Sequence, residues 1–77
     1  MYTVYVLQDS NGKLYKGMTN NLRRRMTEHK SGKTRTTRRM NGLEIAYVEE
    51  YDTFGKARGR ELYLKTAAGR RFLKTKL

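Results

Sequence analysis

Residues 14–29 read LYKGMTNNLRRRMTEH, and this stretch predicts a strand that passes directly into a helix. Its middle, residues 19–21, holds Thr and Asn side chains that accept hydrogen bonds from the first N–H groups of a helix. The helix is expected to run to about His29. Leu22, Met26 and His29 recur at helical spacing, so they predict one stripe that faces the interior.

The helical period separates the three consecutive arginines. Arg25 lies on or beside the apolar stripe with His29, whereas Arg23 and Arg24 point elsewhere. A guanidinium turned towards the core must find a partner or line a cleft, because an unpaired charge is costly there. Arg25 and His29 are therefore candidate site residues. The alternative, that Arg25 reaches water along its stem and His29 is an ordinary edge residue, stays open at this point.

The segment before the helix predicts a β-hairpin. Residues 2–7 and 13–18 have strand character, and residues 9–12 between them form a turn. A two-residue turn would place Tyr5 and Tyr15 on opposite faces of the hairpin. A three-residue loop ending on glycine would place both on the same face. The sequence leaves both registers open.

The rest of the chain predicts one more strand and one long helix. Residues 30–42 read as a basic loop, residues 43–51 as a third strand, and residues 54–68 as a helix that Gly69 could end. Residues 71–73 predict a short helical tail.

A carboxylate interrupts the apolar stripe of the predicted second helix. Phe54, Ala57, Glu61 and Leu64 recur at helical spacing, which turns Glu61 towards the interior. The alternative is that Glu61 rolls outward and pairs with Lys65 four residues later, although such a pair adds only about 0.2–0.5 kcal/mol.

Composition points to a small basic protein with a polyanionic partner. The 77 residues predict a single domain, 1–77, with a small core. Eighteen Lys and Arg against seven Asp and Glu give a net charge of +11, typical of nucleic-acid-binding proteins. Without cysteine there is no disulfide or thiolate zinc site, and without a long apolar run we expect a cytoplasmic protein that does not bind membranes. Its oligomeric state, monomer or weak dimer, stays open.

Several short motifs resemble, in order and spacing, the GIY-YIG nuclease domain. They are residues 3–5 (TVY), 15–17 (YKG), 21–29 (NLRRRMTEH) and 60–65 (RELYLK). The chain is most similar to the short stand-alone bacterial and phage members, which share the ending YLKTAAGRRFL of residues 63–73. The resemblance implies an α/β (α+β) fold, with a small three-stranded antiparallel or mixed sheet and helices packed around it.

The resemblance also implies a divalent-metal-dependent DNA endonuclease of low sequence specificity. By position, it implies catalytic roles for Tyr5, Tyr15, Arg25, His29 and Glu61, with Glu61 as the ligand of Mg²⁺ or Mn²⁺. An arginine and a metal ion would supply counter-charge to a phosphate undergoing hydrolysis. The proton of the attacking water could pass to a tyrosine or to His29, and this choice stays open.

The motifs depart from the family pattern at the first tripeptide, TVY, and at Lys16, which stands where an apolar residue is usual. Strand alternation turns Lys16 away from Tyr15, so it either snorkels to water or reaches a phosphate. The expected partner is DNA, with branched and single-stranded forms included. The alternative function is a nucleic-acid-binding module with weak or no cleavage. Either way, the residues expected to contact phosphates are Lys16, Arg23, Arg24, Lys33, Arg35, Arg38, Arg39, Arg70 and Arg71.

Overall fold

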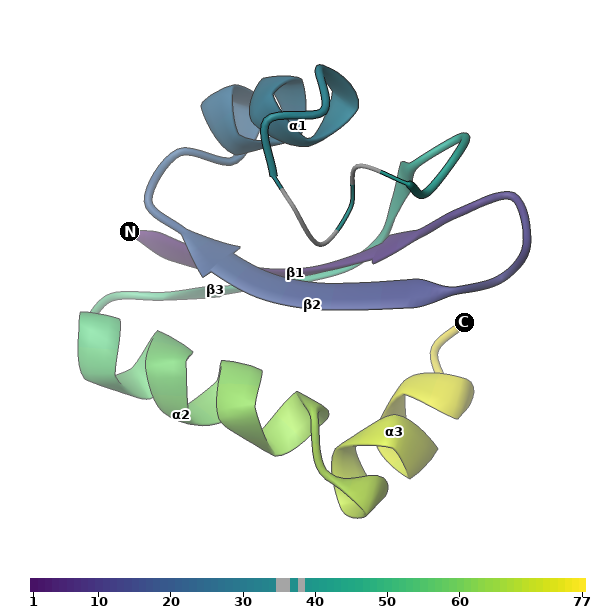
Figure 1. The fold of residues 1–77 in the computed structure, drawn as a ribbon. Helices are drawn as coiled ribbons and strands as arrows, with labels where there is room; N and C mark the ends of the chain where they lie inside the picture. The colour runs from purple at the N-terminus through teal and green to yellow at the C-terminus, as the bar shows by residue number, and fades with distance from the viewer. Residues whose placement is uncertain (35–36, 38) are drawn as a thin grey trace.

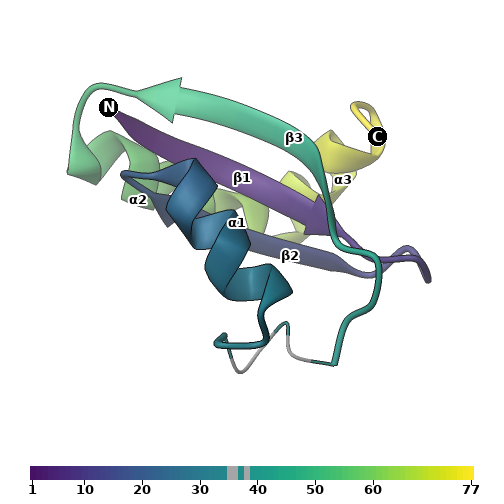
Figure 2. The ribbon, with the colours of Figure 1, turned by 90° about the horizontal axis from the view of Figure 1, so that it is seen from above.

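A computed structural model describes residues 1–34, 37 and 39–77. The elements follow in the order β1 (Tyr2–Gln8), β2 (Leu14–Thr19), α1 (Leu22–Lys30), β3 (Glu44–Tyr51), α2 (Phe54–Leu64) and α3 (Ala67–Lys74). The strands form one antiparallel sheet in the order β2-β1-β3. Helix α1 covers one face of the sheet, and α2 and α3 cover the other (Figures 1 and 2). The predicted α+β class is confirmed. In the described part of the chain, no helix is both long and apolar enough to cross a membrane.

The hairpin loop settles the register that the sequence left open. It has three residues, 10–12, and ends at Gly12 with φ of +82°, a conformation that glycine adopts without strain. Tyr5 consequently lies opposite Gly17, two residues beyond Tyr15. Both tyrosines therefore project from the same face of the sheet, the face covered by α1.

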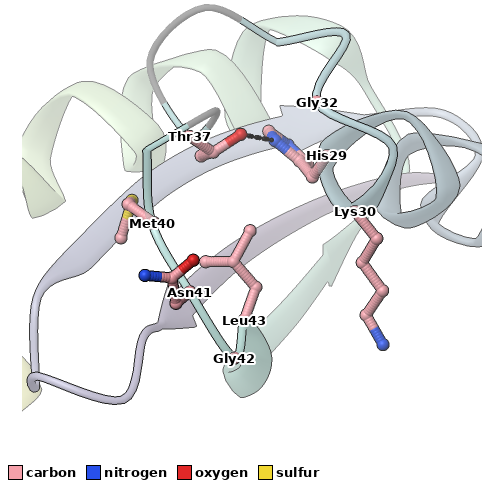
Figure 3. Close-up of a pocket in the computed structure, with 8 residues that line it drawn as sticks. All are labelled: His29, Lys30, Gly32, Thr37, Met40, Asn41, Gly42 and Leu43. Carbon is pink, nitrogen blue, oxygen red and sulfur yellow. Dashed lines mark hydrogen bonds between the residues drawn. The ribbon is translucent and has the colours of Figure 1, made fainter.

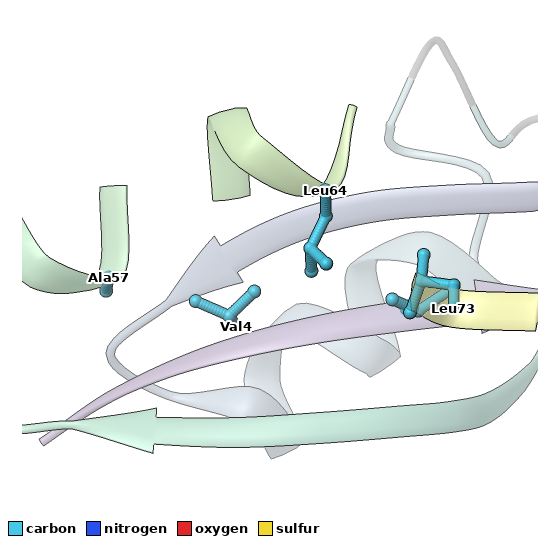
Figure 4. Close-up of a cluster of buried hydrophobic side chains, with 5 residues drawn as sticks. Val4, Ala57, Leu64 and Leu73 are labelled. Carbon is cyan, nitrogen blue, oxygen red and sulfur yellow. The ribbon is translucent and has the colours of Figure 1, made fainter. Parts of the chain in front are cut away.

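The central strand β1 is buried on both of its faces. Strand residues alternate in direction, so Tyr5 and Leu7 face α1 while Val4 and Val6 face the two C-terminal helices. Figure 4 shows part of this second core, in which small and branched side chains from α2 and α3 pack against β1. Its buried members are Val4, Val6, Ala57, Leu64 and Leu73.

The predicted second helix is in fact two helices. α2 ends at Leu64, and α3 begins at Ala67 after Thr66, whose hydroxyl accepts a hydrogen bond from the Gly69 N–H. Gly69 does not end a helix, as the sequence suggested, but lies buried inside α3. A Cβ at this position would lie 2.1 Å from the Tyr63 carbonyl oxygen, so only glycine lets α3 fold back against the end of α2.

Candidate functional site

Four of the five predicted site residues lie together on the face of the sheet covered by α1. Tyr5 and Tyr15 come from the hairpin, and Arg25 and His29 come from α1. The Tyr5 hydroxyl lies 2.8 Å from His29 Nε2, within hydrogen-bond distance. The His29 ring packs edge-on against both tyrosines, with centroids 5.7 Å from Tyr5 and 4.9 Å from Tyr15. The three rings therefore form one aromatic cluster.

His29 is buried and fully hydrogen-bonded, so it is not an ordinary edge residue. The His29 ring faces the segment that connects α1 to β3. In this segment, Thr37 Oγ1 lies 2.8 Å from His29 Nδ1 (Figure 3). His29 is 2% exposed and Thr37 is 1% exposed. Beside them is a cavity of about 450 Å³, lined by His29, Lys30, Gly32, Thr37, Met40, Asn41, Gly42 and Leu43. Thr37 was not predicted, because a threonine in a loop with no sequence period carries no signal of its partner.

Burial shifts the pKa values of Tyr5 and His29 in the directions that favour their neutral forms. Burial raises the pKa of Tyr5 to about 12, and hydrogen bonding and charge from Arg25 only partly oppose it. Burial, followed by the charge of Arg25, lowers the pKa of His29 below its ordinary value. At neutral pH the Tyr5 phenol is therefore protonated and the His29 imidazole is neutral. Such a pair can pass a proton between Oη and Nε2.

Arg25 lies at the edge of the cluster rather than inside it. Its side chain is 33% exposed, and Nη1 donates to Glu28 Oε1 at 2.9 Å. Glu28, three residues further along the same helix, is thus its partner. Hydrogen bonding to Glu28, and then to Tyr5, raises the pKa of Arg25, so its charge is permanent. Partly exposed ion pairs add little stability, so this guanidinium can exchange Glu28 for another oxyanion.

Glu61 does not join the other four residues. It lies on α2, on the opposite face of the sheet, and its side chain is 8% exposed. Arg58 Nη1 donates to Oε1 at 2.7 Å, and Lys65 Nζ donates to Oε2 at 3.2 Å. Glu61 therefore faces inward, as the helical period predicted, and it also pairs with Lys65; the outward orientation that the alternative required is wrong. Phe54, by contrast, is 58% exposed and does not belong to the buried stripe.

Gly17 lies under the two tyrosines on the edge strand β2. A Cβ at this position would lie 2.7 Å from Tyr5 Oη and 3.0 Å from Tyr15 Cε1. Real Cβ atoms do not approach other atoms as closely as 2.7 Å, so the Tyr5 ring in this position requires a glycine here, and the approach to Tyr15 would also be tight. Because β2 is an edge strand, no further strand of the described sheet lies beyond Gly17.

Glu61 is a carboxylate that could hold a metal ion. Within residues 1–34, 37 and 39–77, no group of three or more His, Cys, Asp or Glu side chains is arranged to bind one. Mg²⁺, however, keeps several water ligands and commonly takes only one or two carboxylates. The single carboxylate of Glu61 fits this requirement. Arg58 and Lys65, both about half exposed, can release its oxygens.

The residues predicted to contact phosphates are mostly solvent-exposed. Lys16 is half-buried and faces the side of the sheet away from Tyr15, as strand alternation predicted. Arg35 and Arg38 lie outside the described residues. Those that are exposed are Arg23, Arg24, Lys33, Arg39, Arg70 and Arg71.

A Thr37→Val variant tests how His29 is held. In a neutral imidazole one nitrogen donates and the other accepts, so Thr37 and Tyr5 together select the tautomer. Removing the hydroxyl leaves Nδ1 without its partner and is expected to cost about 1–3 kcal/mol of stability. The chain has one histidine, so its nitrogen NMR shifts report the tautomer directly. They should change in Thr37→Val and stay close to wild type in Thr37→Ser. Unchanged shifts in the valine variant would contradict this role.

Comparison with known proteins identifies relatives across nearly the whole chain. The model of the GIY-YIG catalytic domain family matches residues 1–74. A UPF0213 protein of Clostridium perfringens is 35% identical over 66 residues, which cover 84% of this chain and 71% of that protein. A UPF0213 protein of Bacillus pumilus is 40% identical over 63 residues, covering 80% of this chain but only 64% of the relative. The solution NMR structure of a UPF0213 protein of Bacillus halodurans matches with a TM-score of 0.60 and 25% identity, covering 97% of this chain and 84% of that one.

Proposed function

Because the chain belongs to the GIY-YIG catalytic domain family, we propose that it is a divalent-metal-dependent endonuclease that hydrolyses phosphodiester bonds in DNA. Nuclease activity on nucleic acid is the general property of this family. The observation that carries the proposal is the cluster of Tyr5, Tyr15, Arg25 and His29 around Gly17. It combines a permanent positive charge at a partly exposed rim with a proton-accepting pair buried behind it.

Arg25 is the residue that binds the phosphate in this proposal. Hydrolysis of a phosphodiester builds negative charge on the phosphate oxygens, and a fixed guanidinium stabilises that charge. Arg25 lies at the exposed rim of the cluster, and its partner Glu28 is itself partly exposed. A phosphate can therefore replace Glu28 and accept two parallel N–H hydrogen bonds from the guanidinium.

The Tyr5–His29 pair is proposed to accept the proton of the attacking water. A phenol with a pKa of about 12 is a poor base on its own at neutral pH. Neutral His29 can take the phenol proton on Nε2 while the phenol oxygen takes one from the nucleophile. Tyr5 is 1% exposed, so the more accessible Tyr15 would orient the water beside it.

Glu61 is proposed to hold Mg²⁺ or Mn²⁺. When bound, such an ion supplies counter-charge to the phosphate and leaving-group oxygens. Glu61 lies on α2, which packs against β1 and β2, while the tyrosines lie on the other face of the same strands. Since β2 is the edge of the sheet, a nucleic-acid backbone lying along this strand would have both faces within reach.

The sequence specificity of cleavage is proposed to be low. The exposed basic side chains on α1 and α3 suit contacts to phosphates, which position a nucleic acid without reading its bases. Affinity should then fall steeply with salt concentration, because phosphate contacts release counterions.

Cleavage assays with three DNA forms test the proposed function. Plasmid, single-stranded and branched DNA are incubated with the protein in Mg²⁺, in Mn²⁺ and in EDTA. We expect cleavage of at least one form with either metal, none in EDTA, and none by a Glu61→Gln variant prepared in parallel. Cleavage that persists in EDTA would contradict metal dependence, and equal cleavage by the variant would contradict the role of Glu61.

The second candidate is a nucleic-acid-binding module without cleavage. One observation favours it: both oxygens of Glu61 already accept from Arg58 and Lys65, on the face away from the tyrosines. In that case wild type and Glu61→Gln should bind DNA equally and cut none of the three forms.

A further inference from the structure

A second cluster of positive charge lies on the face of the sheet away from the tyrosines. Lys16 projects from β2 towards α3, where Arg70 and Lys74 stand one helical turn apart. All three line a cavity of about 420 Å³. The other lining residues, none of which has an acidic side chain, are Gln8, Gly12, Leu14 and Leu77.

These cations are held close together although they repel one another. Like charges four residues apart on a helix are unfavourable, and Arg70 and Lys74 have this spacing. Burial, followed by the charges of Arg70 and Lys65, lowers the pKa of Lys16. Within the described residues, Lys16, Arg70 and Lys74 form no ion pair with an acidic side chain, and the neighbouring Lys65 is occupied by Glu61. An anion from outside the chain would relieve this repulsion.

We propose that Lys16, Arg70 and Lys74 form a second phosphate-binding site for the backbone of a nucleic acid, on the sheet face opposite the tyrosine cluster. The inference rests on the proposed function for the class of ligand. A guanidinium and two ammonium groups suit phosphate oxygens, and contacts to phosphates position a nucleic acid without reading its bases.

The position of Lys16 connects the second phosphate-binding site with the tyrosine cluster. Tyr15 and Lys16 are consecutive on β2, so their side chains point to opposite faces of the sheet. Because β2 is the edge strand, a backbone that crosses this edge can contact Arg25 on one face and Lys16 on the other. The DNA substrate must then extend beyond the phosphate bound by Arg25, far enough for a neighbouring phosphate to reach Lys16. This gives Lys16, which departs from the family pattern, a role at the edge of the sheet.

Binding measurements without metal test the second site. A labelled DNA duplex is titrated in EDTA with wild type, Lys16→Gln, Arg70→Gln and the double variant, at several salt concentrations. The double variant should bind roughly tenfold more weakly, and its salt slope should fall by about 2, since each lost phosphate contact removes about 0.9. The matched control is Lys56→Gln, which removes one charge at an exposed position paired with Asp52. It should change the affinity less than about twofold.

Three results would overturn the proposal. The first is a loss of affinity in Lys56→Gln as large as in Lys16→Gln, which would mean that only net charge matters. The second is a double variant that binds as wild type. The third is binding of inorganic phosphate to wild type, lost in the double variant, at a phosphate concentration and matched ionic strength that leave DNA binding unchanged, which would mean that the site takes free phosphate and not DNA.

The thermal stability of the same variants separates binding from structure. Removing mutually repelling charges should leave the melting temperature of the double variant unchanged or higher. A clear decrease would indicate that these side chains stabilise the fold instead. Because the titrations are done in EDTA, their outcome stands whether or not the protein cleaves DNA, so a failure of the proposed nuclease function is seen separately.

Discussion

Replacing Glu61 by glutamine is expected to lower the rate of metal-dependent DNA cleavage by roughly a thousandfold, because a bound metal ion contributes several kcal/mol to transition-state stabilisation. Glutamine keeps the shape of the side chain but removes the charge that attracts the cation. Arg58 and Lys65 lose their partner, yet both are about half exposed and can turn to water, so the fold should persist. The measurement is the cleavage rate as a function of Mg²⁺ concentration.

Arg58→Gln is the matched control for this prediction. Arg58 donates to Glu61 at 2.7 Å, and its charge competes with any cation for the same carboxylate. Its removal should preserve cleavage and lower the Mg²⁺ concentration needed for half-maximal rate. If Glu61→Gln cuts as fast as wild type, or Arg58→Gln raises the metal requirement, Glu61 is not the metal ligand.

The second large effect is expected at Gly17. In Gly17→Ala the new Cβ would lie 2.7 Å from Tyr5 Oη and 2.8 Å from Tyr5 Cζ, so the ring must move. That movement breaks the 2.8 Å contact between Tyr5 and His29 and shifts Tyr15 as well. A displacement of about 1 Å in a catalytic group can cost on the order of 10²-fold in rate. The cleavage rate and the NMR signals of the single histidine should both change.

Gly59→Ala is the control for this substitution. A Cβ at Gly59 meets nothing within 4 Å, and the residue is exposed in the interior of α2. Alanine should therefore leave cleavage unchanged and stabilise the helix by up to about 1 kcal/mol. Gly17→Ala at the wild-type cleavage rate, or with unchanged histidine signals, would show that the Tyr5–His29 pair is not required.

The sequence alone determined the features that depend on neighbouring residues. The helical period identified Arg25 and His29 at one side of α1 and the inward turn of Glu61, and the glycine in the hairpin loop limited Tyr5 and Tyr15 to two registers. Periodicity is reliable here because each element buries one of its faces. The same reasoning failed where a single helical period was extended too far: it included Phe54 in the buried stripe and continued the second helix past Leu64.

Only the tertiary structure decided how these elements meet. The hydrogen bond between His29 and Thr37 and the position of Glu61 across the sheet both depend on packing between segments. Such contacts have no sequence period, because they join residues whose separation along the chain is set by the loops and not by an element's repeat. Tyr5, Tyr15, Arg25, His29 and Glu61 could thus be named from the chain, whereas the partners Thr37 and Glu28 and the division of the site between two faces of the sheet required the fold.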